Sequence, residues 1–313
     1  MTASEQLAQF AAGSKALPKL CREYKKERAT VHLKELVGGA LSFYAAAAVA
    51  KTGGVHIFVA EDRDAAAYLL NDFYNLLDEK QVYFFPSSYK RSAAYGAEDA
   101  QGVVQRTTAM NAVRGFTKGY LVVCTYPEAL AERVVDAATL QRDTIAVKLG
   151  DKISIAVLED ALADANFTRV DFVYEPGQYS VRGGIVDVFS YSESKPYRID
   201  FFGDEVETIR TFDVETQLSK EKLDSIYIVP EMSKNAKDST SLLGSLPRNT
   251  FIAARDLAWC KERIGSVWND DPVVADEESF ADIDQMRKKL VRGEDFLREV
   301  LDFRRIHFGA RPM

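Results

Sequence analysis

The segment LKELVGGALSF, residues 33–43, has the glycines of a loop that could bind phosphate. A working phosphate loop reads Gly, four residues, Gly-Lys-Ser/Thr. Its glycines let backbone N–H groups approach the phosphates, its lysine neutralises them and its hydroxyl binds Mg²⁺. Here Glu35 takes the place of the first glycine and Ala40 that of the second. Leu41 replaces the lysine, and only Ser42 matches.

Two interpretations of this segment remain open. With Gly38 and Gly39 at its turn, it is either a degenerate phosphate loop or an ordinary turn that never bound nucleotide. The acidic pair Glu61-Asp62 could be mistaken for a magnesium site, but without a phosphate-loop lysine there is no nucleotide for the metal to serve. We expect this pair to begin the next helix, where carboxylates favour the helix dipole.

Histidines and cysteines give no sign of a metal site or a nucleophile. The chain has three of each, namely His32, His56, His307, Cys21, Cys124 and Cys260. In the sequence the histidines are isolated from cysteines and from one another, and the cysteines form no CxxC pair. We therefore predict no catalytic residue and no metal ligand, and we expect reduced, mostly buried thiols.

The stretch PYRIDFF is a candidate for binding another protein. Side chains alternate along a strand, so its residues divide into two faces. The core face is predicted to carry Tyr197, Ile199 and Phe201, and the opposite face Arg198, Asp200 and Phe202. A phenylalanine gains nothing from water, whereas an arginine beside an aromatic ring is a frequent energetic centre of protein interfaces. The second face is therefore a candidate binding surface.

The Gly-Asp loop at 203–204 predicts a two-residue type II′ turn, because glycine readily takes the positive φ that this turn needs. Such a turn pairs residues across the two strands of a hairpin. We expect Phe202 to lie opposite Glu205, and Asp200 opposite Glu207.

Arg182 lies in another strand-like stretch, GQYSVRGGIVDVFSY at 177–191, beside a glycine pair. Two roles are open for Arg182 and Arg198. A guanidinium can grip a carboxylate of a partner protein through two parallel hydrogen bonds. Alternatively, the arginines form cross-strand salt bridges within the chain, for example from Arg198 to Glu207 or Glu205, worth at most about 1 kcal/mol if exposed.

The elements around these residues form two patterns. Apolar strands at 55–60, 82–86 and 120–125 alternate with helix-period segments at 63–77 and 97–115, which predicts an α/β domain with a parallel sheet. After Val135 the pattern changes to short strands and one helix, as in a separate α+β domain. A polar linker begins at Glu231, and the remainder is expected to be mainly helical.

Composition narrows the class of protein. The chain has 313 residues, 47% of them hydrophobic and 28% charged, and a net charge of −7, which disfavours a protein that mainly grips nucleic acid. Basic clusters at 19–28 and 304–311 are expected on solvated helix faces, with duplex-DNA binding through 19–28 as an alternative. With no signal peptide and no apolar run near the roughly 20 residues of a membrane span, we expect a cytoplasmic protein.

Three stretches carry a resemblance to a known family. They are ELVGGALS (35–42), EPGQYSVRGGIVDVFSY (175–191) and PYRIDFFGDEVETIRTFD (196–213). With the terminal helices, they resemble the amino-terminal region of the bacterial transcription-repair coupling factors, the Mfd family. That region is itself similar to the first domains of the excision-repair protein UvrB. The resemblance runs from Leu33 to the last residue.

The resemblance implies a degenerate P-loop NTPase-like domain with a parallel sheet, like domain 1 of UvrB, interrupted by a smaller α+β domain. Residues 1–136 and 231–313 would form the P-loop NTPase-like domain, and residues 137–230 would form the smaller α+β domain. In the family the smaller domain docks the damage sensor UvrA. By resemblance, Arg182 and Arg198 would contact UvrA together with Phe202, with Asp200 orienting an arginine.

Two departures from UvrB bear on activity. The phosphate loop of UvrB is intact, and a tyrosine-rich DNA-clamping hairpin follows its second strand, where this chain has only SSYKRSAAYGAEDAQG (87–102). Both departures favour a non-catalytic adaptor without cofactor. We expect it to be a monomer. The alternative is a UvrB-like, ATP-dependent enzyme that binds damaged DNA. In the family, ATP and Mg²⁺, RNA polymerase and duplex DNA are bound by domains outside this chain, so a fragment is expected.

Overall fold

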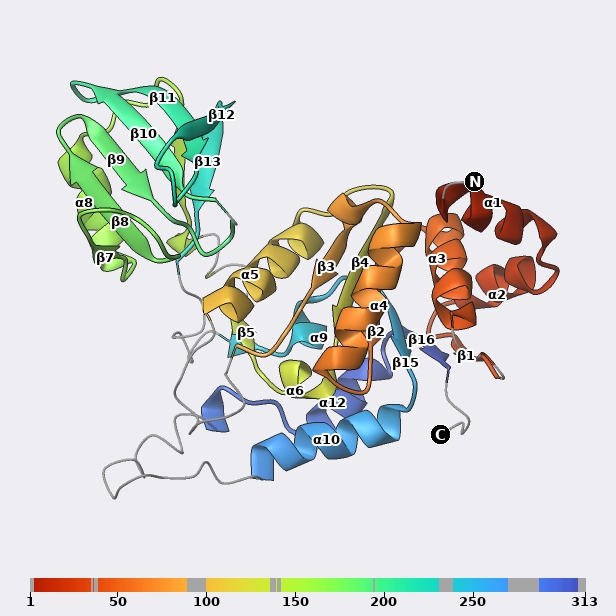
Figure 1. Ribbon diagram of the computed structural model, residues 1–313. Coiled ribbons are helices and arrows are strands. Elements are labelled where there is room, and N and C mark those ends of the chain that lie inside the picture. The colour runs from red at the N-terminus through yellow and green to blue at the C-terminus, as the bar shows by residue number, and fades with distance from the viewer. Residues whose placement is uncertain are drawn as a thin grey trace. The chain divides into compact units, whose positions relative to one another are not determined.

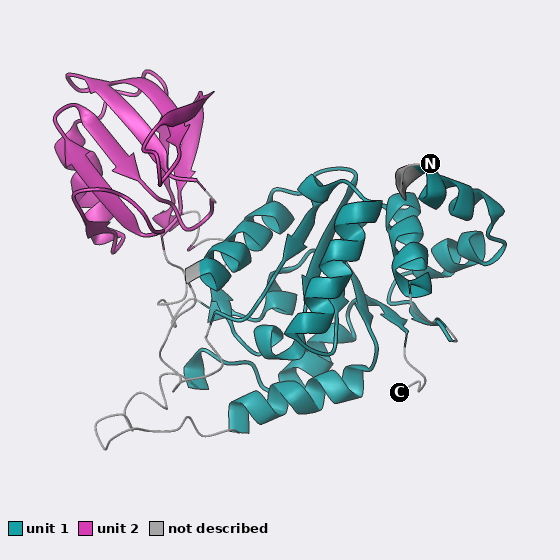
Figure 2. Cartoon of the chain, in the orientation of Figure 1, with its two compact units in different colours: residues 1–134, 239–313 teal, residues 135–238 magenta. Residues whose placement is uncertain are grey.

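The fold is given by a computed structural model (Figure 1). The structure describes residues 3–34, 36, 39–88, 100–135, 139, 142–193, 195–230, 239–269 and 287–308. The chain forms two compact units (Figure 2). Unit 1 combines residues 1–134 with 239–313, and unit 2 consists of residues 135–238. In sequence, unit 2 is therefore an insertion into unit 1.

A six-stranded sheet, parallel throughout, forms the centre of unit 1 (Figure 1). Its strands, in spatial order, are β1 (Thr30–His32), β16 (Arg304–His307), β15 (Phe251–Ala254), β2 (Gly54–Val59), β4 (Tyr120–Thr125) and β3 (Val82–Phe84). In β2 and β4 every residue after the first is buried. Strands covered on both faces read as continuous apolar runs, and the predicted parallel α/β sheet is confirmed.

Helices surround this sheet and one short two-stranded ladder accompanies it. The helices are α1 (Ala3–Gly13), α2 (Ala16–Tyr24), α3 (Ala40–Thr52), α4 (Arg63–Leu76), the 3₁₀ turn η1 (Glu79–Gln81), α5 (Ala100–Arg114), α6 (Pro127–Leu130), α9 (Leu242–Ser245), α10 (Leu257–Asn269) and α12 (Gly293–Val300). The ladder pairs β5 (Val134–Val135) with β14 (Ser239–Thr240). Asp62 caps α4 by accepting a hydrogen bond from the Ala65 N–H at 2.8 Å, so the predicted helix start is confirmed.

The segment after the linker contributes more than helices. Besides α9, α10 and α12 it supplies β15 and β16, which lie inside the sheet between β1 and β2. The expectation that the basic cluster at 304–311 lies on a helix is wrong, because residues 304–307 form β16 and bury Ile306 there. The other cluster, 19–28, lies on α2 and the turn after it, and most of its basic side chains are exposed as predicted.

Unit 2 is built on a mixed six-stranded sheet. In spatial order its strands are β12 (Ser219–Leu223), β11 (Glu205–Phe212), β10 (Tyr197–Phe202), β9 (Ile185–Val188), β8 (Gln178–Arg182) and β7 (Thr168–Arg169). Neighbours are antiparallel except for β7 and β8. A second, two-stranded sheet pairs β6 (Ile145–Lys148) with β13 (Ser225–Ile228). One face of the larger sheet packs on α8 (Ile155–Asp164), whose Leu158 and Leu162 share a core with Val186 and Ile199.

The cysteines are free and buried, as predicted. Burial raises the pKa of all three thiols, Cys21, Cys124 and Cys260, so they are poor nucleophiles. Among the described residues, no helix combines the length and apolarity needed to cross a membrane.

Candidate protein-binding face

The face of the larger sheet of unit 2 that points away from α8, called here the outer face, carries the residues predicted for binding. The alternation along β10 is confirmed. Tyr197, Ile199 and Phe201 are buried in the core, and the intervening side chains are those of Arg198, Asp200 and Phe202. Strand periodicity alone was enough to separate the two faces.

A buried carboxylate that the sequence analysis did not single out organises this face. Asp187, on β9, has no exposed surface and accepts hydrogen bonds from both predicted arginines. Arg198 binds it in a bidentate manner, from Nε to Oδ1 at 2.7 Å and from Nη2 to Oδ2 at 2.8 Å. Arg182 donates from Nη2 to Oδ2 at 2.5 Å. The cross-strand salt bridges that the sequence left open as an alternative are thus formed, with Asp187 as the carboxylate and not Glu207 or Glu205.

Each arginine also stacks on a ring and holds a loop. The Arg198 guanidinium lies 4.5 Å from the centre of the Phe212 ring, and its Nη1 donates to the Gln217 carbonyl at 3.0 Å. Hydrogen bonding to Asp187 raises the pKa of this guanidinium. The Arg182 guanidinium lies 4.9 Å from the centre of the Phe172 ring. These contacts fix both guanidinium planes.

The two arginines differ in how much of them a partner could reach. The side chain of Arg182 is 36% exposed and that of Arg198 is 14% exposed. Arg182 is thus accessible to a carboxylate of a partner. Arg198 is mostly buried and mainly holds Asp187 and the neighbouring loop in place. Arginine is suited to such sites because its five donors can serve several acceptors in one plane.

Asp200 binds a different arginine. Its Oδ2 accepts hydrogen bonds from the Arg210 Nη2 and the Thr208 hydroxyl, both on β11. The resemblance implied that Asp200 orients an arginine, and the arginine that Asp200 binds is Arg210. We call Asp187, Arg182 and Arg198 the Asp187 cluster. Asp200 and Arg210 form a second ion pair, with no net formal charge, on the neighbouring strands β10 and β11.

A bulge changes part of the predicted hairpin register. Phe202 pairs with Glu205 as expected, but Asp200 pairs with Thr208 and not with Glu207. The register shifts between Asp200 and Phe201, so that Glu207 is the additional residue of β11. The turn itself agrees with the prediction, because Gly203 has a φ of 62°.

Phe202 stands at the tip of this hairpin with 79% of its surface exposed. It is the most exposed large apolar side chain in the part of the chain that the structure describes. Leaving a phenylalanine in water gives the isolated chain no stability. An exposed ring at the end of the strand that also carries Arg198 is a residue type found at interface centres.

The phosphate-loop-like segment of unit 1 has its polar group engaged inside the protein. Ser42, the only residue that matches the motif, is buried on α3 and donates from Oγ to Asp72 Oδ2 at 2.5 Å. Ala40 is the first residue of α3, and Gly39 is its N-cap. Glu35 and Gly38 lie outside the described residues.

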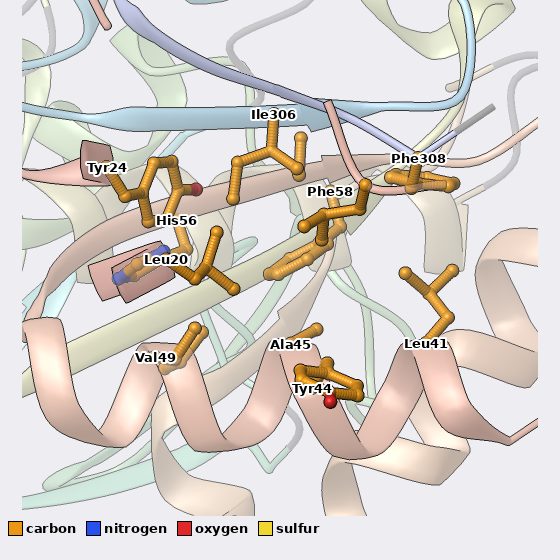
Figure 3. A pocket seen from close by; sticks show the side chains of 13 residues that line it. Leu20, Tyr24, Leu41, Tyr44, Ala45, Val49, His56, Phe58, Ile306 and Phe308 are labelled. Atoms are coloured by element: carbon orange, nitrogen blue, oxygen red, sulfur yellow. The ribbon is translucent and has the colours of Figure 1, made fainter. Parts of the chain in front are cut away.

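Leu41 lines a small apolar pocket between α2, α3 and the sheet (Figure 3). It points from α3 into this pocket on the side of Phe308 (Figure 3). The cavity has a volume of about 10 Å³, roughly the room for one water molecule. A leucine thus occupies the place of the phosphate-binding lysine and contributes to packing.

Two of the histidines, isolated in the sequence, lie together in the fold. His32 on β1 pairs with His307 on β16, and their rings stack with centres 4.8 Å apart. His56 is buried on β2, its Nε2 is 2.9 Å from the Gly53 carbonyl oxygen, and burial lowers its pKa to about 4. Within the described residues, no three side chains of metal-ligating type gather.

Comparisons with known proteins agree with this arrangement. Residues 145–233 match the family model described as "UvrB interaction domain". The transcription-repair-coupling factor of Escherichia coli (strain K12) is 27% identical over 226 residues, which cover 72% of this chain and 19% of that protein. That of Bacillus subtilis (strain 168) is 27% identical over 199 residues, 63% of this chain and 17% of that protein. This chain is homologous to the N-terminal part of transcription-repair-coupling factors.

A third relative matches a shorter part of the chain at higher identity. The transcription-repair-coupling factor of Haemophilus influenzae (strain Rd) is 38% identical over 101 residues, 32% of this chain and 9% of that protein. The chain spans about a fifth or less of the length of these three relatives.

The match to the UvrB interaction domain, residues 145–233, encloses the whole outer face. The face includes Asp187, which parity could have found, because it lies between the inward-facing Val186 and Val188 and must therefore point the same way as Arg198. The carbonyl partners of the arginines could not have been found in this way, since they depend on how distant loops fold over the sheet.

Proposed function

We propose that this chain is the adaptor part of a transcription-repair coupling factor and that the outer face of unit 2 binds the excision-repair protein UvrA. In the complete protein, other domains would contact RNA polymerase and duplex DNA. Docking of UvrA would then bring the repair machinery to a stalled polymerase. Homology to transcription-repair-coupling factors supports this context.

One observation carries the proposal for the site. Arg182 and Arg198 both bind one buried carboxylate, and Phe202, at the end of the strand that carries Arg198, is 79% exposed. Two guanidinium groups on one carboxylate leave an excess positive charge, which an acidic side chain of the partner can neutralise. Because both planes are already fixed, little side-chain entropy is lost on binding.

We infer that unit 1 is a degenerate P-loop NTPase-like domain and that this chain hydrolyses no ATP. Leu41 packs in an apolar pocket and the Ser42 hydroxyl is engaged by Asp72, so neither supplies the charge or the metal ligand that nucleotide binding needs. The rival is a UvrB-like ATP-dependent repair enzyme. Calorimetric titration with ATP and Mg²⁺ separates them, since micromolar affinity would refute the adaptor proposal.

The docking proposal is tested by titrating purified UvrA into the wild-type chain and into Arg182→Ala. Arg182 is the preferred arginine because Asp187 keeps its bidentate bond to Arg198 in this variant. We expect the wild type to bind and the variant to bind at least about thirtyfold more weakly, as for a typical interface centre.

Arg169→Ala is the matched control. Arg169 is also an exposed arginine of unit 2 in an ion pair, 2.7 Å from Glu159 of α8, and it lies outside the Asp187 cluster. Its loss should leave the UvrA affinity unchanged. Absence of binding by the wild type would refute the proposed function, and equal binding by Arg182→Ala would refute the assigned site.

A further inference from the structure

Three exposed apolar side chains lie on two loops that neither the sequence motifs nor the proposed site include. Phe172 is 50% exposed and Tyr174 is 56% exposed, both on the loop after β7. Leu218 is 63% exposed, on the loop before β12. We call these three residues the loop patch.

The two loops are joined to each other. The Gln217 side-chain amide donates to the Val173 carbonyl at 3.4 Å and to the Val214 carbonyl at 2.8 Å. Gln217 has a φ of 57°, an uncommon backbone conformation for a residue other than glycine. The patch residues therefore lie directly beside this link, because Phe172 and Tyr174 flank Val173 and Leu218 follows Gln217.

The loops are also anchored to the sheet beneath them. Val173 is completely buried in a small apolar cluster with Phe189 and Phe212. Gln178 Oε1 accepts hydrogen bonds from the backbone N–H groups of Tyr174 and Glu175, at 2.9 and 3.1 Å. These contacts fix the backbone of the loop that carries Phe172 and Tyr174. The side chains of the loop patch can therefore be buried against a partner without the entropic cost of ordering a loop.

The same arginines that form the proposed docking site hold both loops. Arg182 Nη1 donates to the Asp171 carbonyl at 2.8 Å, and the guanidinium stacks on Phe172. Arg198 Nη1 donates to the carbonyl of Gln217, the residue before Leu218. The loop patch is therefore continuous with the Asp187 cluster.

We propose that the loop patch is a second, apolar part of the docking face and that it buries against an apolar surface of the same partner, UvrA. This inference rests on the proposed function. The Asp187 cluster carries an excess positive charge, which fits an acidic side chain of the partner. The adjoining apolar side chains fit an apolar patch beside that acidic side chain. Apolar contact would lengthen the life of the complex, while the arginines would steer its formation.

The experiment compares two tyrosines of equal exposure in the full chain. Tyr174 in the patch is 56% exposed, and Tyr227 on β13, outside the patch, is 57% exposed. We titrate UvrA into Tyr174→Ala, Leu218→Ala and Tyr227→Ala, and we follow dissociation by surface plasmon resonance at low and high salt. Melting curves show whether each variant keeps its fold.

We expect Tyr174→Ala and Leu218→Ala each to weaken binding by about tenfold, through faster dissociation at both salt concentrations. Tyr227→Ala should bind like the wild type. If the wild type binds UvrA and both patch variants dissociate like Tyr227→Ala, the loop patch is an ordinary solvated surface and this inference fails alone. If the wild type does not bind UvrA, the proposed function fails, and the extension fails with it.

Discussion

The phosphate-loop-like segment of unit 1 and the outer face of unit 2 both contain residue types that could do chemistry. They differ in what the fold does with those groups. In unit 1, Ser42 is buried and donates to Asp72, and Leu41 lines an apolar pocket. In unit 2, Arg182 is held by Asp187 yet remains 36% exposed.

This difference shows how internal partners can either remove a polar group from function or prepare it. The Ser42 hydroxyl, which donates its one proton to the partly buried Asp72 carboxylate, has no second proton to offer. A guanidinium has five N–H donors, so binding Asp187 fixes its plane and leaves donors for a partner. In unit 1 the Ser42 hydroxyl is therefore engaged inside the protein, whereas in unit 2 the Arg182 guanidinium stays accessible.

The largest effect is expected at Asp187. Asp187→Ala leaves Arg182 and the mostly buried Arg198 without their shared carboxylate, and breaking a buried pair in this way typically costs about 3–5 kcal/mol. The free energy of unfolding of unit 2 should fall by that amount. Amide hydrogen exchange in β9 and β10 measures it.

Glu207→Ala serves as the control for this variant, because Glu207 is an exposed carboxylate at the bulge of the same sheet. Its removal should change the free energy of unfolding by less than about 0.5 kcal/mol. Unchanged protection of β9 and β10 in Asp187→Ala would contradict the role given to the carboxylate.

The next effect concerns pH and unit 1. Burial lowers the pKa of His56 from its ordinary 6.5 to about 4. Between these values the unfolded chain binds a proton at His56 and the folded chain does not, so stability is lost as the pH falls from 6.5 to 4. The loss is about 3 kcal/mol, at about 1.4 kcal/mol for each pH unit.

His56→Gln removes this titration and should therefore make the stability of unit 1 less dependent on pH between 6.5 and 4. Both tryptophans, Trp259 and Trp268, belong to unit 1, so urea denaturation followed by their fluorescence reports on this unit. An equally steep pH dependence in wild type and variant would show that His56 is not the cause.

A smaller effect is expected at Ser42. Ser42→Ala leaves Asp72 without its hydrogen-bond donor and should lower the free energy of unfolding of unit 1 by about 1 kcal/mol. UvrA affinity should not change, because the residue takes no part in the outer face. A loss of UvrA affinity without a loss of stability would break the contrast between the two regions.

The sequence predicted the faces of β10 correctly, because a period of two needs only the local chain. It failed where pairing depends on another strand. The bulge at Asp200 moved the cross-strand partner from Glu207 to Thr208, and no local signal marks that shift. The same periodicity places Asp187 on the outer face, but its role was missed. A carboxylate between two valines gave no sign other than that of a strand.

The strands β15 and β16 were missed for a different reason. Phe251–Ala254 is an apolar run of four residues, too short to distinguish a strand from a helix segment. Arg304–His307 begins with two arginines and reads as a basic surface, although Ile306 and His307 are buried between neighbouring strands. Both strands are defined by the sheet they enter, which is assembled from segments far apart in the chain.

The most direct test of the proposed docking face is a calorimetric titration of UvrA into Phe202→Ala, with Tyr227→Ala as the exposed-ring control. Phe202 contributes nothing to the core, so the variant should melt like the wild type. Its affinity for UvrA should fall by about thirtyfold to a thousandfold, the equivalent of about 2–4 kcal/mol. If UvrA binds wild type, Phe202→Ala and Tyr227→Ala with equal affinity, the outer face is a solvated hairpin and the assignment is wrong.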